Sequence, residues 1–104
     1  MSWQRAVHIA DATRYIYARQ VTRENYGNFR GARLSVSVNG ERIQVRRGDW
    51  ITTDPQTGRQ DVTDDQRLHD EWTLESELPP RLLRLVQGYP TYDEWRKYYP
   101  ECRA

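Results

Sequence analysis

The chain has 104 residues, which is enough for one domain with a modest core. Its 16 Lys and Arg and 15 Asp and Glu give a net charge of +1, which excludes a uniformly basic nucleic-acid-coating protein and an acidic nucleic-acid mimic. No apolar run is long enough for a membrane-spanning helix or a signal-peptide core, and the lone Cys102 cannot form an internal disulfide and fits a reducing compartment.

The first part of the chain predicts a weakly patterned arm followed by a strand. Residues 1–13 carry a few apolar side chains at helical spacing with no cap before them, so we expect a short helix or a loose arm. Residues 15–21 are rich in β-formers and predict a strand, with Tyr17 on one face and Ala18 on the other. Residues 22–25 predict a short helical turn.

A β-hairpin is the clearest prediction from the middle of the chain. Residues 34–38 alternate between apolar and polar side chains, and the alternation resumes after Asn39-Gly40. Asn-Gly between alternating runs indicates a type I′ turn, because both central residues of that turn need a positive φ. The sequence then predicts a strand at residues 50–53, a turn at residues 54–58 and a further strand at residues 60–62.

Two capping boxes predict helices in the last third of the chain. Thr63 and Gln66 have the capping-box spacing, and so do Thr91 and Glu94. The capping box at Thr91 predicts the start of a helix that Pro100 ends. Between these two helices the sequence predicts a strand at residues 72–74 and a helix at residues 81–87. Gly88 is expected to be the C′ residue of that helix.

These elements predict an α+β fold: a small bent antiparallel sheet or open barrel with short flanking helices. We expect a single domain over residues 1–104. Its parts are an N-terminal arm at about 1–13, a β-rich unit at about 14–78 and a C-terminal helical segment at about 79–100.

The net charge conceals an uneven distribution along the chain. Residues 1–47 hold nine Arg and three acids, for +6, and residues 48–78 hold two Arg and nine acids, for −7. Either these segments pair within the fold, or they form separate basic and acidic surfaces that can each attract a charged partner. Bipolar surfaces also favour self-association, so a homodimer is a further expectation.

The sequence contains no motif to which we assign catalysis or a cofactor. A phosphate-binding glycine loop, a nucleophile elbow and a zinc spacing are all missing from it. Asp65 and His69 lie four residues apart on a predicted helix, which is a spacing that permits contact, but a solvated helix face explains this pattern better than a metal site. Arg47-Gly48-Asp49 is interpreted as a β-turn rather than a recognition tripeptide.

Arginines and aromatic residues are the candidates for contact with a partner. They interleave between residues 14 and 33, as in proteins that bind single-stranded nucleic acid, although a core strand edged by solvated arginines is the stronger interpretation. Tyr, Trp and Arg also anchor protein interfaces, and the C-terminal helix is rich in Tyr and Trp. The residues expected to contact a partner are Arg19, Arg30, Arg33, Arg46, Arg47, Trp95, Tyr98 and Tyr99.

Two stretches, Ala18-Arg19-Gln20-Val21-Thr22 and Gly48-Asp49-Trp50-Ile51, resemble small uncharacterised phage-encoded proteins. Those proteins carry Pro-Gly-Asp followed by Tyr or Trp and by Ile or Val, and the resemblance extends from about Tyr15 to Glu75. This chain departs from the pattern at Arg47, where the family has Pro, and its C-terminal helices have no counterpart there. The resemblance implies a phage or prophage origin and an accessory or host-directed role.

The preferred hypothesis is therefore a small, non-enzymatic phage-type accessory protein that binds a host or phage protein in the cytoplasm of a bacterial host. Inhibition of a host factor or a defence complex would fit such a role. One alternative is a small β-barrel that binds nucleic acid through an Arg- and Tyr-rich face. A second alternative is a metal-dependent hydrolase around Asp65 and His69. No cofactor and no membrane association are expected.

Overall fold

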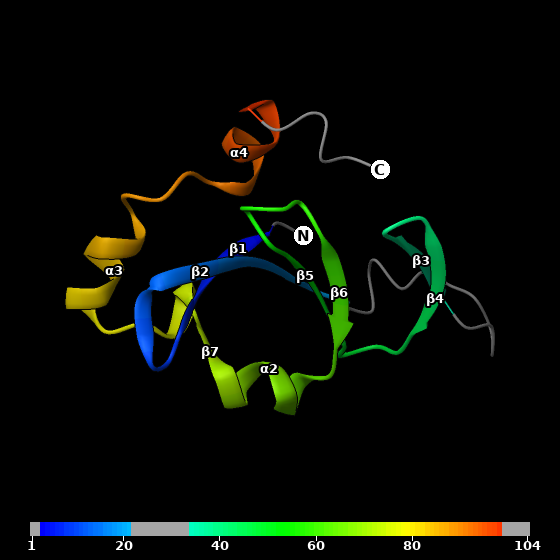
Figure 1. Ribbon diagram of the computed structural model, residues 1–104. Coiled ribbons are helices and arrows are strands. Elements are labelled where there is room, and N and C mark those ends of the chain that lie inside the picture. Colours follow the sequence, from blue (N-terminus) through cyan, green and yellow to red (C-terminus); the bar gives the residue numbers. More distant parts are fainter. Residues whose placement is uncertain (1–2, 22–33, 99–104) are drawn as a thin grey trace.

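The computed structural model describes residues 3–21 and 34–98 (Figure 1). Five strands form one open antiparallel sheet in the order β6-β5-β2-β1-β7, and β3 and β4 form a separate two-stranded sheet. The prediction of an α+β fold with a small bent sheet is confirmed. The elements are β1 (Gln4–His8), β2 (Asp11–Gln20), β3 (Leu34–Val38), β4 (Glu41–Val45), β5 (Trp50–Thr53), β6 (Gln60–Thr63), α2 (Asp65–Glu71), β7 (Trp72–Leu74), the 3₁₀ helix η1 (Glu75–Glu77), α3 (Pro80–Val86) and α4 (Tyr92–Tyr98).

The expectation of a short helix or a loose arm at the start of the chain is wrong for residues 4–8, which form β1. This strand lies between β2 and β7 and pairs with both, so its backbone groups are used on two sides. Ala6 and Val7 are both buried, because each faces a different side of the sheet. Pairing on two sides outweighs the weak helical spacing of the local sequence.

Strand β2 buries side chains on both faces of the sheet, as its alternation predicted. Ala18 belongs to a cluster on one face, together with Ala6, Trp50, Leu68 and Leu74. Tyr17 belongs to a cluster on the other face, together with Tyr92 and Trp95. Leu68 comes from α2, and Tyr92 and Trp95 come from α4, so these helices cover opposite faces of the sheet (Figure 1).

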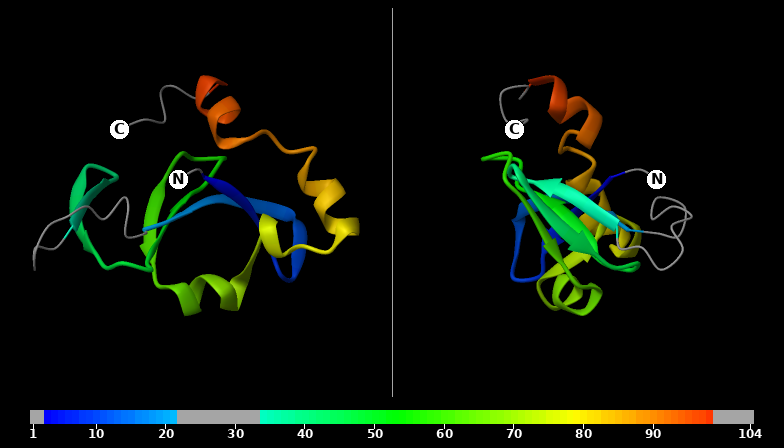
Figure 2. Two further views of the ribbon diagram at one scale, coloured as in Figure 1. Left: turned by 180° about the vertical axis from the view of Figure 1, so that it is seen from behind. Right: turned by 90° about the vertical axis from the view of Figure 1, so that its right-hand side faces the viewer.

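The predicted hairpin is confirmed, with Asn39 and Gly40 at φ values of 52° and 85° in its turn. It stands beside the main sheet rather than within it, as the views from behind and from the side show (Figure 2). The Asn39 side chain donates from Nδ2 to the carbonyl of Gln60 over 2.6 Å, and its Oδ1 accepts from the Gln60 N–H over 2.9 Å. Asn39 therefore makes the turn and also covers backbone groups of edge strand β6.

The other turns and helix caps lie where the sequence predicted them, with two exceptions. Arg47-Gly48-Asp49 is a turn, with Gly48 at a φ of 99°. Thr91 and Glu94 form the predicted capping box, with reciprocal bonds of 3.2 and 3.0 Å. The N-cap of α2 is Asp64, one residue beyond the predicted Thr63, because its carboxylate accepts from the Arg67 N–H over 2.7 Å. The second exception is Gly88, which does not adopt the left-handed conformation expected of a C′ glycine.

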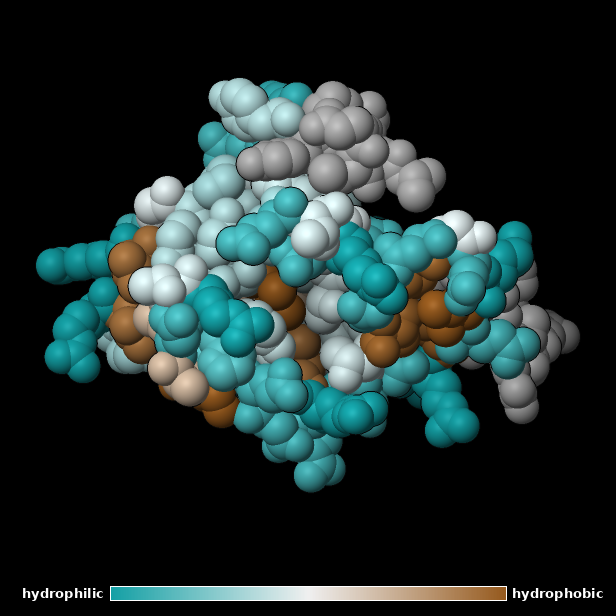
Figure 3. All heavy atoms as spheres, in the orientation of Figure 1, coloured by the Kyte–Doolittle hydropathy of each residue, from teal (hydrophilic) through white to brown (hydrophobic). Residues whose placement is uncertain are grey.

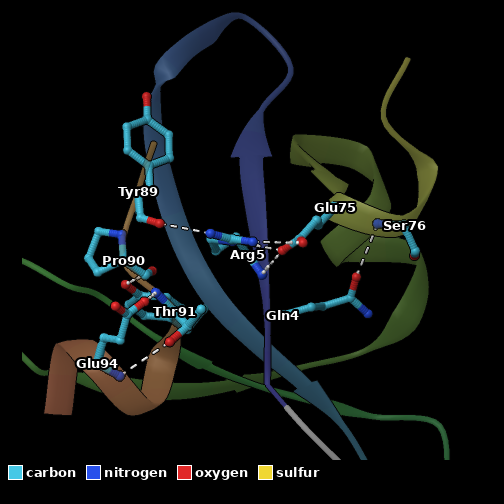
Figure 4. Close-up of polar contacts among 9 residues, drawn as sticks. Gln4, Arg5, Glu75, Ser76, Tyr89, Pro90, Thr91 and Glu94 are labelled. Atoms are coloured by element: carbon cyan, nitrogen blue, oxygen red, sulfur yellow. Dashed lines mark hydrogen bonds and ion pairs between the residues drawn. The ribbon is translucent and has the colours of Figure 1, made fainter. Parts of the chain in front are cut away.

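Arg5 ties the C-terminal segment to the sheet (Figure 4). Its guanidinium donates from Nε and Nη2 to the two carboxylate oxygens of Glu75, each over 2.8 Å, and from Nη1 to the carbonyl of Tyr89 over 2.7 Å. The side chain of Arg5 is 12% exposed and that of Glu75 is 27% exposed. The bonds from Arg5 hold the pKa of Glu75 below its usual value, and those same bonds join β1, η1 and the segment before α4.

Three further bonds attach the same C-terminal segment. The Tyr17 hydroxyl donates to the carbonyl of Pro90 over 2.7 Å, and the Tyr89 hydroxyl donates to the carbonyl of Ala12 over 3.0 Å. The Trp95 indole donates to the carbonyl of Pro55 over 2.9 Å. Side chains from the sheet and from the segment thus satisfy each other's backbone carbonyls, which fixes the position of α4 over the sheet.

We expect Arg5→Met to lower the free energy of unfolding by about 2 kcal/mol at neutral pH, because it leaves the half-buried carboxylate of Glu75 without its partner. Urea unfolding monitored by circular dichroism measures this loss. Glu75 has a lowered pKa in the folded state, so the difference between the two proteins is present above its usual value of 4.5 and shrinks as the pH falls through the folded pKa.

Arg81→Met is the matched control, since Arg81 is exposed on α3 and makes no ion pair with any described residue. An equal effect of the two substitutions, or a difference that persists in acid, would contradict a structural role for the Arg5–Glu75 pair.

Candidate partner-binding surface

The structure separates the residues that the sequence singled out for partner binding. Arg30, Arg33 and Tyr99 lie outside the described residues. Arg46 and Arg47 are exposed in the turn between β4 and β5. The other three predicted residues are Arg19 on β2 and Trp95 and Tyr98 on α4.

Trp95 is a core residue, so its prediction as a contact residue is wrong. Its side chain is 5% exposed and packs 5.5 Å from the Tyr17 ring, measured between centroids. Tyr98, from the same helix, is 77% exposed. The helical spacing of the aromatic residues could not show which side of α4 would meet the sheet, because several sides of this helix carry rings.

Three exposed arginines lie on β4 and on the turn that follows it, and the other exposed arginines are distributed over the rest of the described residues. Along β4, Arg42 is exposed, whereas Ile43 is half-buried and Val45 is buried. We call Arg42, Arg46 and Arg47 the arginine surface. Arg42 was not among the residues expected to contact a partner, although the alternation of apolar residues in β4 is the signal that places it on the outer side.

A row of half-buried residues crosses the main sheet at the end nearest the hairpin. Arg19 on β2 is paired with Ile51 on β5, and Ile51 is paired with Val62 on β6, so the three side chains lie on one face. All three are partly accessible to solvent. The space-filling view shows hydrophobic surface over β4 and β6 in the same region (Figure 3).

The basic and acidic segments remain mostly apart in the described residues. Within residues 3–21 and 34–98, Arg5 is the one arginine that forms an ion pair with a carboxylate. On the acidic side, α2 and η1 expose five carboxylates, those of Asp65, Asp70, Glu71, Glu77 and the N-cap Asp64. In Figure 1 α2 lies below the sheet and the hairpin lies to the right of the sheet, so the acidic helix and the arginines of β4 and its following turn belong to different parts of the molecule.

His69 bridges two acids on different elements. Its Nδ1 lies 2.8 Å from the carbonyl oxygen of Asp65 and 3.3 Å from that residue's carboxylate, a contact that the four-residue spacing permits. Its Nε2 lies 3.3 Å from the carboxylate of Glu77. The Trp50 indole donates to the same Asp65 carboxylate over 2.9 Å. The backbone carbonyl of Asp65 and the two carboxylates raise the pKa of His69, since they stabilise its protonated form.

In place of Asp70 and Glu71, the neighbours of His69 in the sequence, the fold brings Glu77 to this histidine. No group of three His, Cys, Asp or Glu side chains in the described part of the chain is placed to hold a metal ion. The arrangement joins α2 to η1 through charge, and it can respond to pH.

Two aromatic rings of the proposed base-stacking face are packed beneath the C-terminal segment. Tyr17 is fully buried, and burial raises the pKa of its hydroxyl far above the usual value. The Tyr15 ring stacks on the ring of Tyr89 at 4.1 Å between centroids. These rings cannot stack on bases unless the C-terminal segment moves away.

No helix in the described residues is both long enough and apolar enough to cross a membrane. No family model, curated protein or solved structure matches the chain.

We expect the stability of the protein to fall as the pH rises through the folded-state pKa of His69. A raised pKa means that the protonated imidazole stabilises the fold below its usual value of 6.5, and that this contribution is lost on deprotonation. Urea unfolding at a series of pH values measures the effect. His69→Gln should remove this part of the pH dependence, whereas His8→Gln in β1 should retain it; an unchanged pH profile of His69→Gln would refute the role.

Proposed function

We propose that this protein acts by binding another protein, and that the arginine surface, with Arg19 beside it, forms part of the contact. The observation that carries this proposal is that Arg42, Arg46 and Arg47 are exposed, form no ion pair with any described residue, and lie on the strand that carries the half-buried Ile43 and on the turn after it. Protein interfaces combine an apolar centre with a polar rim, and arginine is enriched in them. Ile43, Ile51 and Val62 supply the apolar component here, and the arginines supply the rim.

The charge distribution supports a partner that carries acidic groups. Because these arginines form no ion pairs with described carboxylates, they retain their full attraction for an external anion. Arg also presents a planar fork that matches a carboxylate, and so favours specific docking over loose association. The exposed carboxylates around α2 would at the same time repel an acidic partner from the opposite side.

The proposed setting is that of a phage or prophage accessory protein in the cytoplasm of a bacterial host, where it would inhibit a host factor or a defence complex. The support for this setting is the resemblance at residues 18–22 and 48–51. In the structure residues 18–20 form the end of β2, and residues 48–51 form part of the turn before β5 and the start of β5, which pairs with β2. A second copy of the chain is another protein partner compatible with this surface.

Nucleic acid is the second candidate partner, because exposed arginines on β4 and on the turn after it are also suited to contact phosphates. Arg42, Arg46 and Arg47 would make such contacts without the stacking that Tyr15 and Tyr17 were expected to provide. This interaction would be strongly weakened by salt and would show little preference for sequence.

Site-specific photo-crosslinking in cells tests the proposal. A photoreactive amino acid at Arg47 should give one discrete protein adduct, and the same residue at Arg67 on α2 should not. The yield at position 47 should fall several-fold when Arg42 and Arg46 are changed to Ala, because two charged contacts of the rim are lost.

Other crosslinking results would change or refute this proposal. A nuclease-sensitive adduct at position 47 would replace the proposal with nucleic-acid binding, and an adduct with the chain itself would identify the partner as a second copy. No adduct at position 47, or equal adducts at positions 47 and 67, would refute the arginine surface as the contact.

A further inference from the structure

His69 on α2 has a hydrogen-bond acceptor at each of its two ring nitrogens. Its Nδ1 lies 2.8 Å from the carbonyl oxygen of Asp65, and its Nε2 lies 3.3 Å from a carboxylate oxygen of Glu77 on η1. A backbone carbonyl can only accept a hydrogen bond, and so can an ionised carboxylate. A neutral imidazole carries a single N–H, so only the imidazolium offers an N–H to both oxygens.

Two acids and one aromatic ring surround His69. Within residues 3–21 and 34–98, the charged groups that form ion pairs with it are the carboxylates of Asp65 and Glu77. Trp50 on β5 meets the imidazole edge-on, at 6.3 Å between centroids, and donates its indole N–H to the Asp65 carboxylate. The Asp65 carbonyl and these two carboxylates raise the pKa of His69. The imidazolium is therefore the form that this geometry stabilises.

The two contacts of the ring respond differently when the imidazolium loses a proton. The Asp65 carbonyl lies four residues earlier in the same helix and is the nearer acceptor, so we expect the proton on Nδ1 to be retained. Nε2 then presents a lone pair to the Glu77 carboxylate, and neither group has a proton to donate. The Glu77 side chain is 51% exposed, so its carboxylate can leave the ring and be hydrated instead.

The 3₁₀ helix η1 is attached to its neighbours through a carboxylate at each end. Its first residue, Glu75, binds Arg5 on β1, and its last residue, Glu77, meets His69 on α2. Arg5 holds the pKa of Glu75 below its usual value, and a guanidinium stays charged, so the first attachment persists through neutral pH. The second attachment depends on the protonation of His69. Leu78 follows η1 directly, and its N–H donates to the Glu75 carbonyl over 3.3 Å.

We propose that the contact between His69 and Glu77 is a pH-sensitive latch between α2 and η1, closed with the imidazolium and open with the neutral imidazole. Opening is local, because Arg5 retains its contact with Glu75 and the pairing of the sheet is unaffected. The released part is the end of η1 and Leu78, which lead towards α3. This inference goes beyond the proposed function, since it involves neither the arginine surface nor a partner.

Nitrogen-15 nuclear magnetic resonance of the full chain, at pH values on both sides of the His69 midpoint, tests which contact is lost. We expect two N–H groups on the His69 ring in acid. Above the midpoint we expect a proton on Nδ1 and none on Nε2. A neutral ring that keeps its proton on Nε2 would still donate to Glu77, and this result would overturn the proposal.

Hydrogen exchange of the Leu78 amide measures the opening itself. After correction for the intrinsic pH dependence of exchange, we expect its protection to fall with the same midpoint as the His69 ring. The Ile9 amide, which donates to the Glu71 carbonyl over 2.9 Å, is the control and should stay protected. Constant protection of Leu78 would contradict the latch. An equal loss at Ile9 would contradict it too, because that result means a general loosening of the fold.

Glu77→Gln is the decisive variant, because an amide can accept from the imidazolium with its oxygen and donate to the neutral ring with its nitrogen. The contact then forms in both states, so the pH-dependent step in Leu78 protection should disappear and the His69 midpoint should fall. Glu71→Gln makes the same chemical change on α2, at a carboxylate that forms no ion pair with a described residue, and should retain the step. Retention of the step in Glu77→Gln would refute the assignment.

Discussion

The contact of Arg5 with Glu75 and with the carbonyl of Tyr89 determines how the two ends of the chain are assembled. It joins a strand near the N-terminus to the segments on either side of α3. Once these are joined, Tyr92 and Trp95 reach the Tyr17 side of the sheet. Two charges are largely removed from water, and bidentate geometry with a third acceptor offsets that cost.

A sheet with both faces covered explains how a chain with few aliphatic residues can fold. Strand β2 contributes Ala18 to one cluster and Tyr17 to the other, so a single strand serves two small cores. The second core consists largely of rings, which bury more area per residue than aliphatic side chains. The same use of rings withdraws Tyr17 and Trp95 from the surface.

Separation of charge connects this fold to its proposed role. Arg5 is an exception among the described arginines because it alone forms an ion pair with a carboxylate, so the arginine surface and the acidic side chains of α2 stay unpaired with each other on different parts of the molecule. Asn39 contributes to this arrangement, since its side chain attaches the hairpin turn to Gln60 on β6. The turn residue that the sequence requires for its backbone conformation thus also positions the hairpin against the sheet.

The sequence by itself determined the features that depend on near neighbours: the Asn39-Gly40 turn, the Thr91–Glu94 capping box and the alternation of β2. Such features form because the groups involved lie within a few residues of each other. Only the tertiary structure decided that residues 4–8 pair as β1, that Trp95 is buried while Tyr98 is exposed, and that Glu77 rather than Asp70 meets His69. These outcomes depend on contacts between distant segments, and local spacing does not specify which of several apolar or acidic faces will make them.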